Sequence, residues 1–245
     1  MKIHIGGILL AESCAQINNK NTNINRIGIL KNAVLASLGL MLFAFGVYLT
    51  IQANIGVAPW EAFNIGLSKT TGIKYGTASI AVSAAVLAAD IALKEKIGIG
   101  MFLDAVLVGK TVDLLNFLDL IKPVEKNIIL SLAMMTVGMF IMGFSQFLYM
   151  KASLGCGPRD SLLVGLKRRT KKVPIGIISA IILAVVTLFA WLLGGPIGIG
   201  TLICAFLEGP IMQLDFKIVR FNPTEITHQN MFDSLKVIFA KKDKS

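Results

Sequence analysis

Two stretches of this chain, 99 positions apart, place charged side chains directly after a proline. Pro59-Trp60-Glu61 and Pro158-Arg159-Asp160 each follow a long apolar run that ends in Gly-x-x-Pro or Gly-x-Gly-Pro. Proline is favoured in the first turn of a helix, and the unpaired N–H groups of that turn can bind a ligand. The predicted substrate-binding residues are therefore those of the two stretches: Asn54, Pro59, Trp60, Glu61, Gly157, Pro158, Arg159 and Asp160.

A purely structural role for these residues stays open. An acid near a helix N-terminus interacts favourably with the helix dipole by about 0.3–1 kcal/mol, and glycines permit tight turns and close helix packing. Arg159 departs from that explanation, because its positive charge lies where the helix dipole is already positive. It requires a partner, and the candidates are Asp160, Glu208 and an anionic substrate.

Charged side chains also interrupt the apolar stretches. An Asp or Lys at the centre of a bilayer costs about 2.5–3.5 kcal/mol on insertion scales, so such residues should face the interior of a helix bundle. Asp104 lacks a partner on its own helix, and Glu208 aligns with Val108, one turn beyond Asp104 in the equivalent segment. We predict that Asp104 and Glu208 couple the movement of a proton or cation. Lys110 and Asp113, three residues apart, are predicted to form a structural ion pair.

The composition argues against an enzyme, a metalloprotein and a nucleic-acid-binding protein. No HExxH, GxSxG or P-loop motif occurs, so we predict no catalytic residues and no cofactor. Cys14, Cys156 and Cys204 lack CxxC or His-paired spacing, so neither a metal site nor a disulfide framework is expected. With 55% hydrophobic and 16% charged residues, the net charge of +10 is better explained by loops on one side of a membrane than by nucleic acid.

The expected fold is an all-α, polytopic membrane protein with six transmembrane helices. The uncharged run 173–207 is too long for one span and contains Gly194-Gly195-Pro196, which should divide it into two. The other four expected spans are 32–52, 75–93, 97–118 and 127–150. Residues 59–68 are too few to cross, so the motif segments are expected as short helices at, or dipping into, the membrane.

The chain is predicted to contain two inverted copies of a three-helix unit. Matches persist at a shift of 99 or 100 positions, as in Gly66-Leu67 with Gly165-Leu166 and Gly98-Ile99-Gly100 with Gly198-Ile199-Gly200. Because three is an odd number of spans, the second unit enters the membrane from the opposite side. Of the 24 Lys and Arg residues, 19 fall on the side shared by both termini, which predicts that both termini are cytoplasmic.

The predicted domain organisation has four parts. Residues 1–26 form a leader and linker, 27–122 the first repeat, 123–220 the second repeat and 221–245 a basic cytoplasmic tail. The tail begins with the helix-start pattern Asn222-Pro223-Thr224-Glu225 and then repeats apolar residues at helical spacing. It is predicted to lie on anionic lipid as an amphipathic helix, and a solvated tail is the alternative.

At these residues the chain resembles the YczE/YyaS/YitT-like family of bacterial multipass membrane proteins. The matching segments lie within residues 39–210, and Gly-x-Gly-Pro-Arg-Asp is the most specific of them. They are Asn54-x-Gly56-x-x-Pro59-Trp60-Glu61, Gly66-Leu67-Ser68, Thr71-Gly72, Gly155-x-Gly157-Pro158-Arg159-Asp160, Leu192-Leu193-Gly194-Gly195 and Gly198-Ile199-Gly200-Thr201. The resemblance implies a location in the bacterial inner membrane and transport as the activity.

These features predict a secondary transporter or exporter of a small molecule, with an anion as one option for the substrate. The two motif helices would line a central path, Arg159 would hold substrate charge, and Asp104 or Glu208 would carry a proton. The alternative is a membrane-embedded regulatory or scaffold protein that recruits a cytoplasmic partner through the basic loop 167–172 and the tail. The expected partners are the lipid bilayer and a small-molecule substrate.

Overall fold

The described part of the chain is entirely α-helical. The computed structural model describes residues 26–95, 97–154, 157–170 and 172–221, and these contain eight helices and no strand. The helices are α2 (Arg26–Gln52), α3 (Pro59–Thr71), α4 (Tyr75–Ala92), α5 (Ile99–Leu118), α6 (Ile128–Lys151), α7 (Pro158–Arg169), α8 (Ile175–Leu192) and α9 (Ile199–Ile218). The expected leader, apart from Arg26, and the expected tail, apart from Phe221, lie outside the described residues.

The helix boundaries follow the prolines and glycines of the sequence. The two short helices begin at the predicted prolines, Pro59 of α3 and Pro158 of α7. The uncharged run breaks between α8 and α9, where Gly194 has a φ of +70° and Pro196 follows. A left-handed φ costs glycine little because it has no Cβ, and proline is unfavourable in a helix interior because it lacks the backbone N–H. The predicted division at this point is confirmed, and α9 continues beyond the apolar run to Ile218.

The protein is a multipass membrane protein. Among the described residues, five helices are long and apolar enough to cross a bilayer: α2, α4, α6, α8 and α9. Their outer faces suit lipid, as on α2, where Leu30, Val34 and Leu38 are 54–68% exposed. α5, predicted as a further span, is not among the five; its 20 residues include three charged side chains.

The most extensive helix contact joins α2 and α6. Their backbones meet at Gly46 and Gly138, and a Cβ added to Gly46 would lie 2.8 Å from the Gly138 carbonyl oxygen. Small residues allow such close approach between helices in lipid, where van der Waals packing replaces the hydrophobic effect. α5 packs along α2, and α9 packs along α6, so α5 and α9 lie on either side of the α2–α6 pair.

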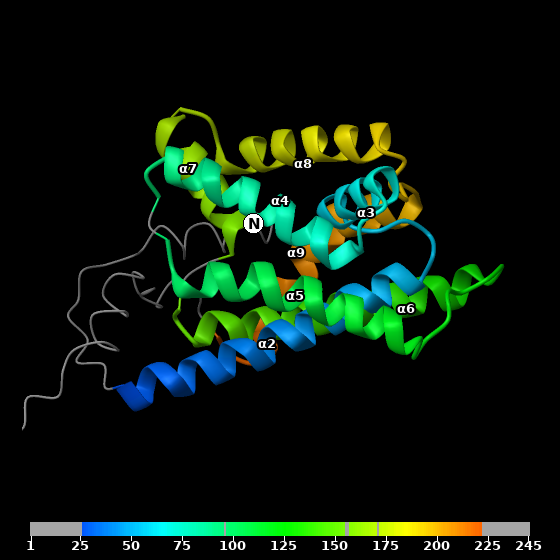
Figure 1. Ribbon diagram of the computed structural model, residues 1–245, viewed down its shortest axis with the longest axis horizontal. Coiled ribbons are helices and arrows are strands. Elements are labelled where there is room, and N and C mark those ends of the chain that lie inside the picture. The colour runs from blue at the N-terminus through cyan, green and yellow to red at the C-terminus, as the bar shows by residue number, and fades with distance from the viewer. Residues whose placement is uncertain (1–25, 96, 155–156, 171, 222–245) are drawn as a thin grey trace, which may run out of the picture.

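The two short helices lie at opposite ends of the bundle (Figure 1). α3 packs mainly against α8, and α7 packs mainly against α4. The C-terminal end of each is tied to the end of its neighbour: the Thr70 hydroxyl donates to the Leu193 carbonyl at 3.2 Å, and Arg169 donates to the Ala92 carbonyl at 3.1 Å. Their N-terminal ends consequently point toward the middle of the molecule.

One helix pair is closed and its counterpart is not. α4 packs along α5, where the backbones of Gly76 and Gly109 touch and Asp113 Oδ1 accepts a 2.7 Å hydrogen bond from the Gly76 N–H. α8 and α9 follow the same order in the second half, yet within the described residues they make almost no contact. The bundle is thus asymmetric at one place.

Candidate functional site

All eight described helices line one cavity inside the bundle. Its volume is ≈ 230 Å³. The charged side chains of its lining come from four helices: Glu61 of α3, Asp104 of α5, Arg159 and Asp160 of α7, and Glu208 of α9. Both short helices therefore contribute the side chains of their first turn to the same cavity, together with two acids from long helices.

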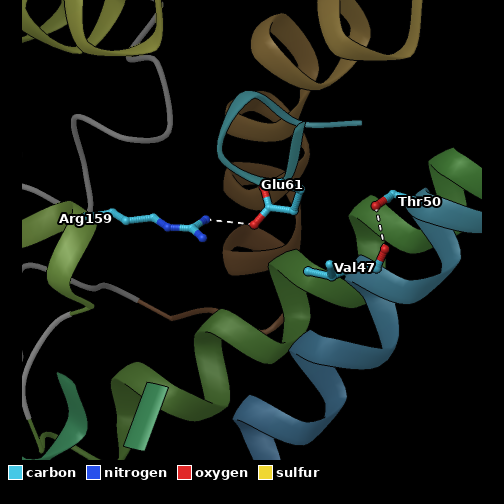
Figure 2. A network of polar contacts seen from close by, with 4 residues as sticks. All are labelled: Val47, Thr50, Glu61 and Arg159. Carbon is cyan, nitrogen blue, oxygen red and sulfur yellow. Dashed lines mark hydrogen bonds and ion pairs between the residues drawn. The ribbon is translucent and has the colours of Figure 1, made fainter. Parts of the chain in front are cut away.

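An ion pair joins the N-terminal ends of the two short helices (Figure 2). Arg159 Nη1 lies 2.8 Å from Glu61 Oε1, and the Glu61 side chain is only 4% exposed. The guanidinium also lies over the Trp60 ring, 5.1 Å from its centroid, a position in which the ring quadrupole attracts a cation. The expectation that Arg159 needs a partner is met by Glu61, and neither Asp160 nor Glu208 forms an ion pair with it in the described structure.

The backbone before each short helix is held by the start of a distant long helix. The Ile55 carbonyl accepts a 2.8 Å hydrogen bond from the Gly200 N–H of α9, and the Leu154 carbonyl accepts a 2.9 Å bond from the Gly100 N–H of α5. Each bond also satisfies an N–H group of a first helical turn, which has no partner within its own helix. These two matched contacts fix where the Pro59 and Pro158 turns enter the bundle.

The environment of Asp160 in the short helix α7 disfavours its charged form. Burial raises the pKa of its carboxyl from 3.8 to about 7; the neighbouring Asp104 carboxyl raises it further, whereas Arg159 lowers it. Such a carboxyl can change its protonation state near neutral pH. The predicted coupling residues Asp104 and Glu208 line the same cavity, so these three acids are brought together from α5, α7 and α9.

Several predicted residues lie outside the cavity or make other contacts. Asn54 is exposed, has a left-handed φ of 54°, and donates to the Val124 carbonyl at 3.3 Å, so it shapes a turn. Pro158 is buried in the first turn of α7 and does not line the cavity. Lys110 is exposed, and the predicted Lys110–Asp113 pair is not among the ion pairs of the described residues, because Asp113 turns to the Gly76 N–H instead.

Other polar residues of the lining were not predicted. They are Ser79 and Ser83 on α4, Gln146 and Tyr149 on α6, and Ser179 on α8. A signal exists for some of them: Ser79 and Ser83 are four residues apart and Gln146 and Tyr149 three apart, so each pair shares a helix face. Within the described residues, no group of three His, Cys, Asp or Glu side chains could hold a metal ion.

Residues 30–216 match the family DUF6198, which is described as a family of unknown function. The chain belongs to this family. It is similar to the uncharacterized membrane protein YczE of Bacillus subtilis (strain 168), with 34% identity over 181 residues that cover 71% of this chain and 80% of the relative. The resemblance inferred from the Gly-x-Gly-Pro-Arg-Asp segment is therefore confirmed.

Two more relatives extend this result. The uncharacterized protein YyaS of Bacillus subtilis (strain 168) is 27% identical over 184 residues, covering 74% of this chain and 90% of the relative. An uncharacterized protein of Haemophilus influenzae is 27% identical over 188 residues, covering 75% of this chain and 84% of the relative. No solved structure matches the chain.

Proposed function

We propose that this protein is a secondary transporter of a small molecule in the bacterial inner membrane. The observation that carries the proposal is the ≈ 230 Å³ cavity where the first turns of α3 and α7 meet. Short segments that place helix N-termini and charged groups near the middle of a helical membrane protein are typical of transport sites. In this proposal the cavity is the substrate site, and the chain performs no enzymatic reaction.

The arrangement of the helices supports inverted repeats. Helices α3, α4 and α5 begin 99, 100 and 100 residues before α7, α8 and α9. The contacts are reciprocal: α2 packs on α5 as α6 packs on α9, and α3 packs on α8 as α7 packs on α4. We infer that α5 is the sixth span, with Asp104 facing the cavity, and that α3 and α7 enter the membrane from opposite sides.

The open α8–α9 pair supports alternating access. In a transporter with inverted repeats, the two halves exchange conformations when the site changes sides. The closed α4–α5 pair would then show one conformation of the three-helix repeat, and the separated α8–α9 pair would show the other. One state of the protein would contain both. Opening α4 from α5 while α8 closes on α9 would expose the cavity to the other compartment.

The charges of the cavity bear on the substrate. Arg159 was expected to hold an anion, but its hydrogen bond to Glu61 already compensates its charge. Asp104 and Glu208 remain the proposed proton-coupling residues, because both line the cavity and a carboxyl inside a membrane protein is typical of proton relays. The distribution of basic residues favours cytoplasmic termini, as the sequence predicts.

Two-sided access to the cavity tests the transporter. Ser179 lines the cavity on α8 and is replaced by Cys in a protein whose Cys14, Cys156 and Cys204 are changed to Ser. A membrane-impermeant thiol reagent is then applied to right-side-out and to inverted vesicles. We expect labelling in both. The matched control is Ser145→Cys on α6, a fully buried serine outside the cavity lining, which should be labelled in neither.

The same experiment separates the transporter from a regulator. Labelling of Ser179→Cys from one side only would contradict transport and fit a receptor pocket that signals to a cytoplasmic partner. The contacts of the basic loop do not favour that alternative, because Arg168 pairs with Glu95 at 3.0 Å and Arg169 bonds to the Ala92 carbonyl. These two cations hold α7 to the end of α4.

A further inference from the structure

Acidic side chains outnumber basic ones in the cavity. Glu61, Asp104, Asp160 and Glu208 line it, and Arg159 is the one basic residue of the lining. The Arg159–Glu61 pair is neutral as a unit. Within the described residues, the other three carboxyls form no ion pair and no hydrogen bond. The remaining charge of the cavity is therefore negative whenever these acids are ionised.

One residue of the cavity lining carries a buried hydroxyl. Tyr149 lines the cavity and is 4% exposed, and its hydroxyl has no hydrogen-bond partner in the described part of the chain. A buried polar group without a partner costs about 1–3 kcal/mol, so a ligand that bonds to it gains that interaction. Gln146, one turn earlier on α6, lines the cavity as well and adds an amide oxygen.

We propose, building on the transport function above, that the cavity binds a small organic cation. Asp104, Asp160 and Glu208 surround it, and Tyr149 accepts a hydrogen bond from it. The three acids come from different helices, so one ligand reaches all of them only if its N–H donors point in several directions, as those of a guanidinium or ammonium group do. Hydrogen bonds from such cations to carboxylates are roughly twice as strong as neutral ones.

The size and charge of the site exclude other ligand classes. A volume of ≈ 230 Å³ is below the roughly 300–1,000 Å³ of pockets for drug-sized ligands, so the cation is small. An anion would lie beside three carboxyls, and like charges that share a site oppose ionisation of one another. A neutral molecule would leave the carboxyls without a counter-charge.

Three planar probes of similar size and different charge test the inference: guanidinium, urea and nitrate. We would measure the uptake of radiolabelled guanidinium into proteoliposomes of the full chain and its competition by each unlabelled probe at low millimolar concentration. We expect uptake that guanidinium inhibits and that urea and nitrate do not. Asp160→Asn and Glu208→Gln keep the shape of the side chain and should weaken guanidinium about tenfold or more, since each loses a charge-assisted hydrogen bond.

Two further variants complete the design. Asp119→Asn makes the same chemical change at the C-terminal cap of α5, outside the cavity lining, and should leave uptake unchanged. Tyr149→Phe removes only the hydroxyl and should weaken guanidinium about tenfold at most. Unfolding of every variant in detergent is followed by circular dichroism, so a loss of uptake with an unchanged transition is assigned to the site.

The outcomes separate the cation site from the transport function. Inhibition by urea equal to that by guanidinium, or stronger inhibition by nitrate, would overturn the cation site and leave transport standing. So would an absence of guanidinium uptake in a protein whose Ser179→Cys variant is labelled from both sides. Full uptake in Asp160→Asn and in Glu208→Gln would also overturn it.

Discussion

The two halves of the described chain contain the same helices in the same order, but only the first half closes its last two helices. Gly76 of α4 touches Gly109 of α5, and Asp113 accepts a hydrogen bond from the Gly76 N–H. One hundred positions later stand Gly176, Gly209 and Gln213, and α8 lies apart from α9. Of the residues of α8, 17% are buried, against 44% of the residues of α4.

This difference shows that paired glycines do not by themselves close two helices. Both halves have a glycine in each of the two helices, so both have room for close backbone contact. Only the first half adds an acidic side chain that bonds across the contact, at the first turn of α4, where N–H groups lack helical partners. The second half is therefore free to open without losing such a bond.

A second difference lies at the start of the short helices. The first half has Trp60-Glu61 where the second has Arg159-Asp160. Arg159 crosses to the first half, pairs with Glu61 and stacks on Trp60, while within the described residues Asp160 forms no ion pair. The acid of α3 is thus compensated and the acid of α7 is not, although both occupy the same position after proline.

The largest expected effect on stability comes from breaking the Arg159–Glu61 ion pair, which distinguishes the acid of α3 from that of α7. Glu61→Ala leaves the Arg159 guanidinium uncompensated and should lower the free energy of unfolding by about 3 kcal/mol, the lower end for buried pairs, because the Arg159 side chain is 27% exposed. Asp160→Ala should cause no loss, since it removes a carboxyl that burial disfavours when charged. Denaturation in mixed detergent micelles, followed by circular dichroism, measures both. Equal losses in the two variants would contradict this comparison.

Gly76→Ala should distinguish the closed helix pair from the open one. The added Cβ would overlap the Gly109 carbonyl oxygen, and overpacking of this kind costs about 1–3 kcal/mol. Gly176→Ala, the matched change in the half-buried start of α8, should alter stability by about 0.5 kcal/mol or less. If α8 closes on α9 during transport, Gly176→Ala should nevertheless slow uptake. A large loss of stability in Gly176→Ala would show that α8 is already packed.

The hydrogen bond across the closed pair has a smaller predicted contribution. Asp113→Ala removes the acceptor of the Gly76 N–H and should destabilise the protein by about 1 kcal/mol. Asp113→Asn keeps a side-chain oxygen in place and should recover most of that loss. The same unfolding measurement applies. Asp113→Asn as unstable as Asp113→Ala would mean that the charge, rather than the hydrogen bond, holds α4 to α5.

Asp160 should also make the stability of the protein depend on pH. Its pKa is about 7 in the folded protein and 3.8 ordinarily, so the folded state binds more protons between these values. The stabilising contribution of Asp160 is complete below pH 3.8 and is lost as the pH rises through about 7. Melting temperatures measured across this range should fall less steeply in Asp160→Asn than in the unchanged protein. Identical slopes of melting temperature against pH in the two proteins would contradict the conclusion that the Asp160 charge is uncompensated.

Local sequence signals were sufficient for the helices. Apolar runs of sufficient length, the prolines at residues 59 and 158 and the break at Gly194-Gly195-Pro196 act through neighbouring residues, so they could be interpreted without the fold. Asp104 and Glu208 were expected to face the bundle interior because each is a charge in an apolar run, and both line the cavity; Lys110, expected there on the same ground, is exposed. The sequence did not show that Asn54 lies in a turn outside the cavity lining, because a turn residue and a ligand-binding residue have the same local pattern.

Contacts between distant segments were decided only by the tertiary structure. Glu61 is 98 residues from Arg159, and no local pattern distinguishes it from the other acids as the partner of that guanidinium. Asp113 bonds to Gly76 rather than to its close neighbour Lys110, because helix packing brings an unpaired N–H within 2.7 Å. The separation of α8 from α9 likewise depends on helix positions. The sequence alone determined which residues are helical, because helix formation depends on local chemistry; the pairing of side chains, the exposure of Lys110 and the opening of α8 from α9 depend on how the helices pack.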